Sequence, residues 1–277
     1  MDNNNSLAKF KRQPKLYIDL PSKGIWYPKD KLEKSEELEV YSMTANDEIA
    51  IKTPDALYTG NAITKVIKSC VPAIVDPWII PMTDMDYILA SIRLASYGSN
   101  LQLSTTCSEC SNQDDYTMDI QTILDFVQNL KHSTLIECNG FKFHLRPLTY
   151  KEYTEIQQRN VQVQRTLFQR VSKMDESDQK QDELDGLYDQ LNDITKFAVL
   201  STIIRIETPE GESEDNPKFI QDFLLEGDKD LYNAVKDTYM DNQENAKMNP
   251  VEVECSECGA KNKTAPNLDY ASFFAVA

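Results

Sequence analysis

Residues 105–112 read TTCSECSN and residues 253–260 read VECSECGA, so the tetrapeptide Cys-Ser-Glu-Cys occurs twice in this chain. The two-residue spacer in each turn lets two thiolates face one ion while backbone N–H groups of the turn donate to their sulfurs. Joined, the two turns would supply the four thiolates of a closed tetrahedral site, and thiolate softness favours zinc over an iron centre. We therefore predict one structural zinc ion, bound by Cys107, Cys110, Cys255 and Cys258.

The separation of the two turns along the chain predicts the architecture. The 144 residues between Cys110 and Cys255 far exceed the spacer of about 15–20 residues in a zinc ribbon, but loop-closure entropy grows only logarithmically with length. We expect an α+β fold, with a mixed small-sheet N-terminal region, a four-cysteine zinc-ribbon-like site and a mainly helical inserted lobe. The predicted domains are a flexible N-terminal arm (1–15), an α+β domain closed by the four-cysteine site (16–148 plus 246–277) and the helical insertion lobe (149–245).

Hydrophobic periodicity predicts the individual strands and helices. Alternating apolar residues indicate a β-hairpin or β-corner at 16–28, a strand at 37–43, strands on both sides of the first cysteine turn, and a hairpin closed by Asn139-Gly140. Apolar residues three and four apart indicate helices. Helices are expected in part of 44–60, at 61–71, 83–97 and 122–130, and twice within 217–246. Two longer helices, at 149–174 and 177–207, are expected to pair as a helical hairpin.

Capping residues precede several of these helices. Thr44 or Asn46 is expected to cap the first, and Thr83 or Asp84 the helix that begins near residue 83. Asn216 is expected to cap a later helix that starts with a proline.

The remaining cysteines and the two histidines give no catalytic pattern. Cys70 shares the apolar face of its helix, which predicts a buried small side chain rather than a reactive thiol. Cys138 and His144 lie in predicted strands, with His144 on the polar face, and His132 follows a helix end, where a cation is favourable.

The acidic composition limits the choice of partners. Asp and Glu number 45 against 29 Lys and Arg, which gives a net charge of −16 and a pI near 4.6. Such a surface repels phosphate backbones, so we expect no nucleic-acid partner; it either keeps the protein soluble or faces a basic protein. No apolar run is long enough to span a bilayer, and the first residues lack the apolar core of a secretory signal. In the reducing cytoplasm this predicts, paired cysteines are more often metal ligands than disulfides.

The cysteine turns have two alternative uses. A redox dithiol would place its thiolate at a helix N-terminus, whereas these turns follow strands and have acidic neighbours that raise thiol pKa values. A zinc-ribbon adaptor in transcription or nucleic-acid processing, the alternative function, needs a basic face. Around the turns, Lys261 and Lys263 stand against five acidic residues: Glu109, Asp114, Asp115, Glu254 and Glu257.

The chain contains no recognisable catalytic signature. Phosphate-binding glycine motifs, zinc-protease motifs and nucleophile elbows are all missing from the sequence, and the two histidines lie in separate elements. We therefore predict no catalytic and no cofactor-binding residues, and favour an assembly role over an enzyme.

Four stretches carry a resemblance to a known family. They are LPSKGIWYP (20–28), MTANDEIAIKTPDALYTGNAITKVIKSCV (43–71), MDYILASIRLASYG (85–98) and RPLTYKEY (146–153). These stretches resemble the T4-type baseplate hub assembly proteins of phages with contractile tails.

The resemblance implies a non-enzymatic protein that helps to build the tail baseplate at its hub. Its partners would be other phage baseplate and hub proteins, and it would act in the host cytoplasm during assembly, with the virion tail baseplate as a second location. The apolar tail Phe273-Phe274-Ala275-Val276 either contacts such a partner or packs on the protein's own core.

Overall fold

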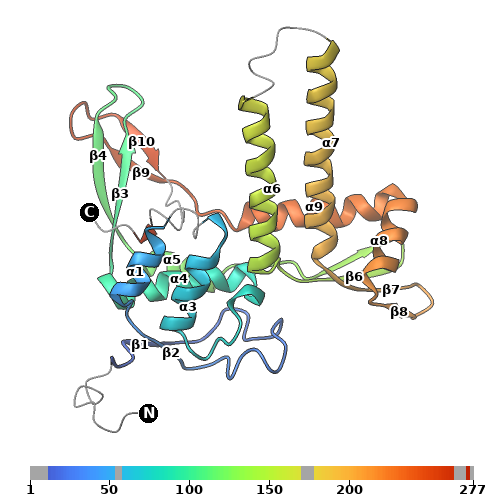
Figure 1. Ribbon diagram of the computed structural model, residues 1–277, viewed down its shortest axis with the longest axis horizontal. Helices are drawn as coiled ribbons and strands as arrows, with labels where there is room; N and C mark the ends of the chain where they lie inside the picture. The colour runs from blue at the N-terminus through green and yellow to red at the C-terminus, as the bar shows by residue number, and fades with distance from the viewer. Residues whose placement is uncertain (1–11, 54–57, 170–177, 265–272, 275–277) are drawn as a thin grey trace. The chain divides into compact units, whose positions relative to one another are not determined.

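The computed structural model describes residues 12–53, 58–169, 178–264 and 273–274. Within these residues the α-helices are α1 (Ala45–Ile51), α3 (Asn61–Cys70), α4 (Met82–Tyr97), α5 (Gln121–Gln128), α6 (Tyr150–Gln169), α7 (Asp178–Ser201), α8 (Pro217–Glu226) and α9 (Lys229–Asn245), with a 3₁₀ turn at Pro77–Ile79. The strands are β1 (Leu16–Ile18), β2 (Leu38–Val40), β3 (Asn100–Thr106), β4 (Gln113–Asp119), β5 (Leu135–Cys138), β6 (Phe141–Leu145), β7 (Ile203–Glu207), β8 (Ser213–Glu214), β9 (Val251–Glu254) and β10 (Lys261–Thr264). Helices with small antiparallel sheets confirm the predicted α+β class (Figure 1).

The chain forms two compact units. The first contains Met1–Pro77, Thr83–Asn129 and Met248–Ala277, and the second contains Trp78–Met82 and Leu130–Lys247. Most of the predicted N-terminal arm lies outside the described residues. The limits of an independently folding helical lobe stay a prediction.

Three two-stranded ribbons and a helical core build the first unit. The ribbons are β1–β2, β3–β4 and β9–β10. α1 packs on α3, whose Ile63, Val66, Ile67 and Cys70 are fully buried, as the spacing predicts. Thr44 caps α1, and its hydroxyl and the Asp47 carboxylate form a reciprocal capping box.

A buried carboxylate holds the turn at residues 20–28. The structure makes this stretch a series of turns after β1, and β1 pairs with the distant β2, so a local hairpin is not formed. Thr83 and Asp84 both lie inside α4 rather than capping it, which corrects the prediction. The Asp84 carboxylate accepts hydrogen bonds from the Ser22 N–H (2.9 Å), the Ser22 hydroxyl and the Tyr27 hydroxyl (3.1 Å), so both oxygens of this buried group have hydrogen-bond partners.

The apolar tail packs on the first unit where it is described. Phe273 and Phe274 are 2% and 4% exposed, and the Arg93 guanidinium lies 5.6 Å from the centre of the Phe273 ring. Of the two alternatives for the tail, core packing therefore applies to these two residues. Ala275 and Val276 lie outside the described residues.

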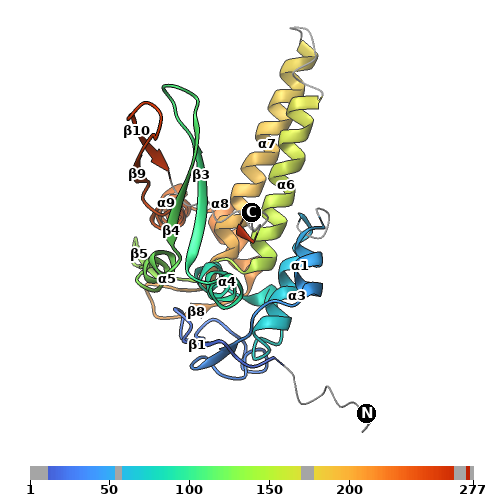
Figure 2. The ribbon, with the colours of Figure 1, turned by 90° about the vertical axis from the view of Figure 1, so that its left-hand side faces the viewer.

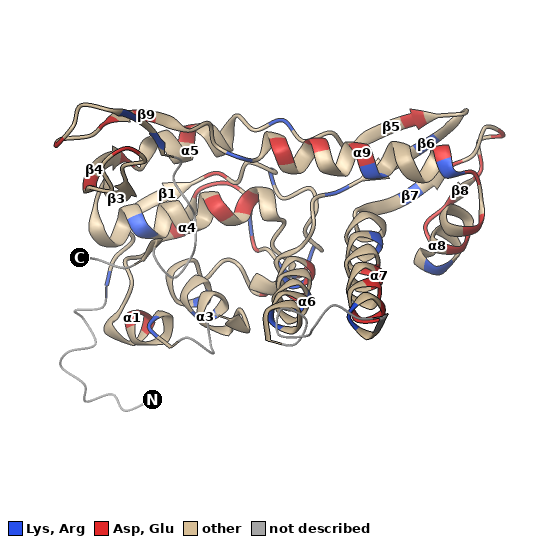
Figure 3. Ribbon diagram, turned by 90° about the horizontal axis from the view of Figure 1, so that it is seen from above, with Lys and Arg blue, Asp and Glu red and all other residues tan. Residues whose placement is uncertain are grey.

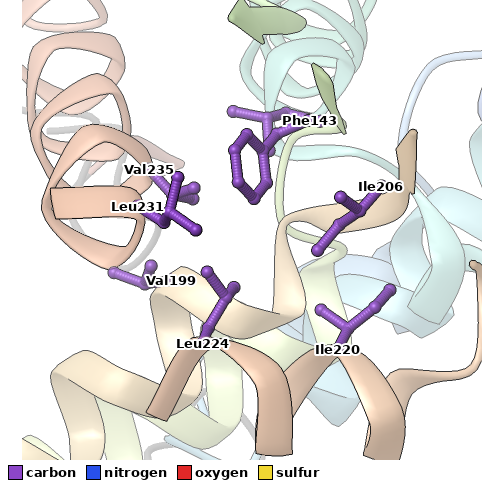
Figure 4. Close-up of a cluster of buried hydrophobic side chains, with 8 residues drawn as sticks. Phe143, Val199, Ile206, Ile220, Leu224, Leu231 and Val235 are labelled. Atoms are coloured by element: carbon purple, nitrogen blue, oxygen red, sulfur yellow. The ribbon is translucent and has the colours of Figure 1, made fainter. Parts of the chain in front are cut away.

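A four-stranded antiparallel sheet forms part of the second unit, in the order β5-β6-β7-β8. Phe143 of β6 lies opposite Ile206 of β7, and their side chains pack with Leu224 of α8 and Val235 of α9 (Figure 4). The turn of the β5–β6 hairpin has positive φ at Asn139 (50°) and Gly140 (83°), which is the backbone that the Asn-Gly signal predicts.

Strand β7 corrects a helix prediction. The helical spacing was expected to continue to residue 207, but α7 ends at Ser201 and Ile203–Glu207 pairs with β6. The run of isoleucines suits a strand as well as a helix, and pairing with β6 decides between them.

The predicted helical hairpin is present as α6 and α7. Ile156 and Val163 of α6 form its core with Leu187, Ile194 and Ala198 of α7. The second unit continues with α8, capped by Asn216 with Pro217 at its first position, and α9. No helix in the described part of the chain combines the length and the hydrophobicity that crossing a bilayer requires.

Candidate metal centre

The first cysteine turn is a tight knuckle at the tip of the β3–β4 hairpin. The Cys107 N–H donates to the Asn112 carbonyl (2.8 Å), and the Ser111 N–H donates to the Cys107 carbonyl (3.0 Å). This geometry needs a left-handed residue, and Ser111 takes it with φ of 59°.

The second turn repeats the first, position by position, between β9 and β10. The Cys255 N–H donates to the Ala260 carbonyl (2.9 Å), and the Gly259 N–H donates to the Cys255 carbonyl (3.0 Å). Gly259 takes the left-handed position with φ of 71°. In each turn the first cysteine is buried and the second is exposed, so the likeness extends to solvent access.

The four sulfurs converge. Cys107 Sγ lies 3.7 Å from Cys258 Sγ, Cys110 Sγ lies 3.6 Å from Cys255 Sγ, and all four sulfurs lie within 4.8 Å of one another. A tetrahedral zinc with Zn–S bonds of about 2.3 Å places its sulfurs about 3.8 Å apart. The spacing therefore fits a zinc-sized ion, and Figures 1 and 2 show the two hairpins side by side.

Each knuckle is also braced by the return strand of the other hairpin. The Ser108 N–H and hydroxyl donate to Asn262 Oδ1 on β10 (3.1 and 3.2 Å). In the equivalent contact of the second knuckle, the Ser256 N–H donates to Asp114 Oδ2 on β4 (3.0 Å), and the Ser256 hydroxyl donates to Asp114 Oδ1. The two hairpins thus form a pseudo-twofold pair that is held together by protein contacts beside the sulfurs.

This bracing is not predicted from the sequence, where Asp114 is a negative charge near the turn and Asn262 has no expected role. Asp114 follows Cys107 by seven residues and Asn262 follows Cys255 by seven, so the repeat extends beyond the tetrapeptide. Hydrogen bonds from Ser256 lower the pKa of Asp114, which keeps this acceptor ionised.

The sulfurs of the free cluster differ in pKa, which is lowered for Cys107 and raised for Cys110 and Cys258. The pKa of Cys107 falls to about 6, first because the backbone N–H of Cys110 donates to its sulfur and then through the Asn262 side chain, which corrects the rise expected from acidic neighbours. For Cys110, a hydrogen bond from the Asn112 backbone opposes a rise, but the neighbouring Cys258 and Cys255 sulfurs raise its pKa to about 12. The free cluster therefore offers a thiolate near neutral pH, and binding a cation would release the other protons.

The other sulfurs and imidazoles lie elsewhere. Cys70 is buried in α3 and Cys138 is half-buried in β5; neither joins the cluster. His144 points away from the sheet core, as predicted, with Nε2 2.9 Å from the Glu207 carboxylate. Burial lowers the pKa of His132 to about 4, so it is neutral at pH 7 rather than the helix-end cation expected from the sequence.

Comparison with known proteins gives a family. Residues 19–275 match the family described as T4 bacteriophage base plate protein. This chain belongs to that family. No curated protein and no solved structure matches it. Membership confirms the resemblance as far as a T4-type baseplate protein, and the matched range includes both cysteine turns.

Proposed function

We propose that this baseplate protein acts in assembly of the baseplate hub, through protein–protein contacts and without catalysis. Family membership over residues 19–275 is the observation that supports this proposal. Its partners would be other baseplate and hub proteins, met in the host cytoplasm during assembly, and the finished tail baseplate would be its location in the virion. The net charge of −16 favours partners with basic surfaces.

We also propose that the cysteine cluster binds one structural zinc ion. The residues fit the ion in number, chemistry and spacing, with Cys107, Cys110, Cys255 and Cys258 as the ligands. Four protein ligands fill a tetrahedral zinc and leave no position for water or substrate, so the ion would cross-link the β3–β4 and β9–β10 hairpins rather than activate a reactant.

A phage that lacks this protein tests the assembly role. Infected cells should accumulate tail parts without complete hubs in electron micrographs, and supplying the protein should restore complete baseplates. The purified protein should bind at least one individually purified baseplate protein of the same phage. Normal baseplates in its absence would refute the proposal.

Elemental analysis tests the zinc separately. The purified protein should carry one zinc per chain, and a Cys107→Ser/Cys258→Ser variant should carry none. The matched control is Cys70→Ser/Cys138→Ser, which removes two cysteines outside the cluster and should keep the zinc. Iron, or no metal, in the parent protein would refute it.

A further inference from the structure

The serine that both cysteine turns share makes its contacts outside its own hairpin. Ser108 and Ser256 stand at the second position of each Cys-Ser-Glu-Cys sequence. Each uses its N–H and its hydroxyl as donors, Ser108 to Asn262 on β10 and Ser256 to Asp114 on β4. Because donor and acceptor lie on different hairpins, these contacts hold the two knuckles at the separation that the four sulfurs need.

The two acceptors are themselves held in place. Asn262 is 7% exposed, and its Nδ2 donates to the Ala260 carbonyl (3.2 Å), which leaves Oδ1 directed at Ser108. Asp114 Oδ1 also accepts a hydrogen bond from Asn112 Nδ2 (2.9 Å). An acceptor that is already oriented loses little conformational freedom when its donor arrives, so both side chains are preorganised for the junction.

Further contacts across the junction surround one of the ligand positions. Asn112 Nδ2 lies 4.0 Å from Cys255 Sγ and 3.4 Å from Ser256 Oγ. The Tyr116 hydroxyl donates to the carbonyl of Glu254 (2.9 Å), the residue before Cys255. The β3–β4 hairpin therefore contacts Cys255 and the residues on both sides of it. A ligand placed by such outer contacts needs less ordering when an ion binds.

We propose that Asp114 and Asn262 are positioning residues of the metal centre, which hold the thiolates of the two knuckles in place for the ion and thereby set how tightly zinc is bound. The proposal rests on the zinc site proposed above. Neither side chain would touch the ion, since four thiolates fill a tetrahedral zinc. Outer partners of metal ligands typically contribute a factor of about 10–100 in metal affinity.

Alanine at each acceptor tests the proposal. Zinc affinity of the full-length protein is measured at pH 7 by competition with a chelating dye of known affinity. Asp114→Ala and Asn262→Ala should each weaken zinc binding by about 10–100-fold, because the serine donors across the junction lose their acceptor.

Asp115→Ala is the matched control for charge. Asp114 and Asp115 are adjacent on β4, whose acidic positions are red in Figure 3. The Asp115 carboxylate accepts a hydrogen bond from Ser104 of the same hairpin, so its removal deletes one negative charge near the cluster and no contact across the junction. This variant should bind zinc like the parent.

The conservative variant Asp114→Asn separates the acceptor from the charge. Asparagine removes the same charge as alanine but keeps one oxygen that can accept from Ser256, while its amide nitrogen cannot accept the second bond. Asp114→Asn should therefore bind zinc more tightly than Asp114→Ala and less tightly than Asp115→Ala. Binding equal to that of Asp115→Ala would overturn the proposal, and this comparison holds even if the alanine variant does not fold.

Cobalt(II) in place of zinc reports the arrangement of the sulfurs. A tetrahedral cobalt–thiolate centre absorbs visible light at energies that depend on its ligand geometry. The bands should shift or weaken in Asp114→Ala and Asn262→Ala and stay unchanged in Asp115→Ala. If the two residues only supported the fold, the metal-free variants would melt earlier while zinc affinity and the cobalt bands stayed parental, and that result would overturn the proposal.

The outcomes for the parent protein separate this proposal from the zinc site itself. If the parent binds neither zinc nor cobalt, both proposals fail. If the parent binds zinc and the Asp114 and Asn262 variants bind it as tightly as Asp115→Ala does, the zinc site stands and the two residues have no positioning role.

Discussion

Ser111 and Gly259 occupy the same position in two nearly identical turns, but the left-handed backbone at that position costs serine more free energy than glycine. Both have positive φ, at 59° and 71°. Glycine adopts this region without steric cost, whereas an L side chain there costs about 1 kcal/mol. The first knuckle is therefore strained where the second is not, although both place their cysteines in the same way.

We expect opposite effects from exchanging these residues. Ser111→Gly should raise the melting temperature or leave it unchanged, with a gain of up to about 1 kcal/mol, and Gly259→Ala should destabilise the protein by about 1 kcal/mol. A Cβ at Gly259 would meet only Glu254 Oε1 at 3.6 Å, so backbone conformation rather than a clash would cause the loss. Thermal unfolding of the metal-loaded variants measures both, and a stabilising Gly259→Ala would contradict the argument.

Asp84 is a second single residue with a large expected effect. Asp84→Ala would leave the Ser22 N–H, the Ser22 hydroxyl and the Tyr27 hydroxyl without their acceptor in a buried place. Unpaired buried donors cost about 1–3 kcal/mol each before relaxation, so we expect a loss of at least about 3 kcal/mol in urea denaturation. Glu36→Ala, an exposed carboxylate in the same unit, serves as control and should change stability by less than about 0.5 kcal/mol.

Among the elements, the start of α6 shows how one short motif fixes a helix. Thr149 and Glu152 form a capping box, in which the Thr149 N–H donates to Glu152 (2.8 Å) and the Glu152 N–H donates to the Thr149 hydroxyl (3.3 Å). Arg146 adds two hydrogen bonds to the same carboxylate, at 2.7 and 2.8 Å. These residues belong to RPLTYKEY, one of the stretches that resemble the family. There the resemblance corresponds to the capping box that starts α6 shortly after β6 ends.

We expect this carboxylate to stabilise α6 in a pH-dependent way. Burial alone would raise the pKa of Glu152, but hydrogen bonds from Arg146 and Thr149 overcome it and lower the pKa below 4.5. A lowered pKa contributes stability that is present above pH 4.5 and is lost as the pH falls through the folded-state value. Glu152→Gln should therefore cost about 1–2 kcal/mol at pH 7 and should reduce the acid sensitivity of unfolding.

The control is an exposed pair on the same helix. Glu155→Gln removes the partner of Arg159, whose ion pair is 41–45% exposed, and should cost less than about 0.5 kcal/mol. Equal losses from the two variants would mean that the capping geometry adds nothing.

In the molecule as a whole, the cysteine cluster joins parts of the first unit that lie far apart along the chain. It brings residues 107–110 to residues 255–258, and the second unit's Leu130–Lys247 lies within the loop that this junction closes. A metal bound there would stabilise the first unit, because the ligands come from two hairpins of that unit. The second unit has cores of its own that contain none of these cysteines.

Removing the metal should therefore act selectively. Chelation, or serine at all four cluster positions, should lower the melting temperature of the first unit by about 10 °C or more, since structural zinc contributes several kcal/mol to folding. Hydrogen exchange should increase in β3, β4, β9 and β10 and stay nearly unchanged in the β5–β8 sheet. A quadruple serine variant that melts no earlier than the parent would refute a stabilising metal.

The helices, the Asn-Gly hairpin and the two knuckles were readable from the amino-acid sequence, because capping, turn chemistry and periodicity depend on residues within about four positions of one another. The meeting of the two knuckles was also predictable, since a pair of thiolates is half of a tetrahedral site. Other contacts depended on which distant group is available in the folded chain. Thr83 or Asp84 was expected to cap a helix, but Asp84 instead accepts hydrogen bonds from Ser22, 62 residues away. Ile203–Glu207 is a strand because it pairs with β6. The bracing of Ser108 and Ser256 likewise forms only once the hairpins are side by side. The sequence shows the equal spacing of Asp114 and Asn262 from the first cysteine of each turn, but which group each of them binds depends on the tertiary structure.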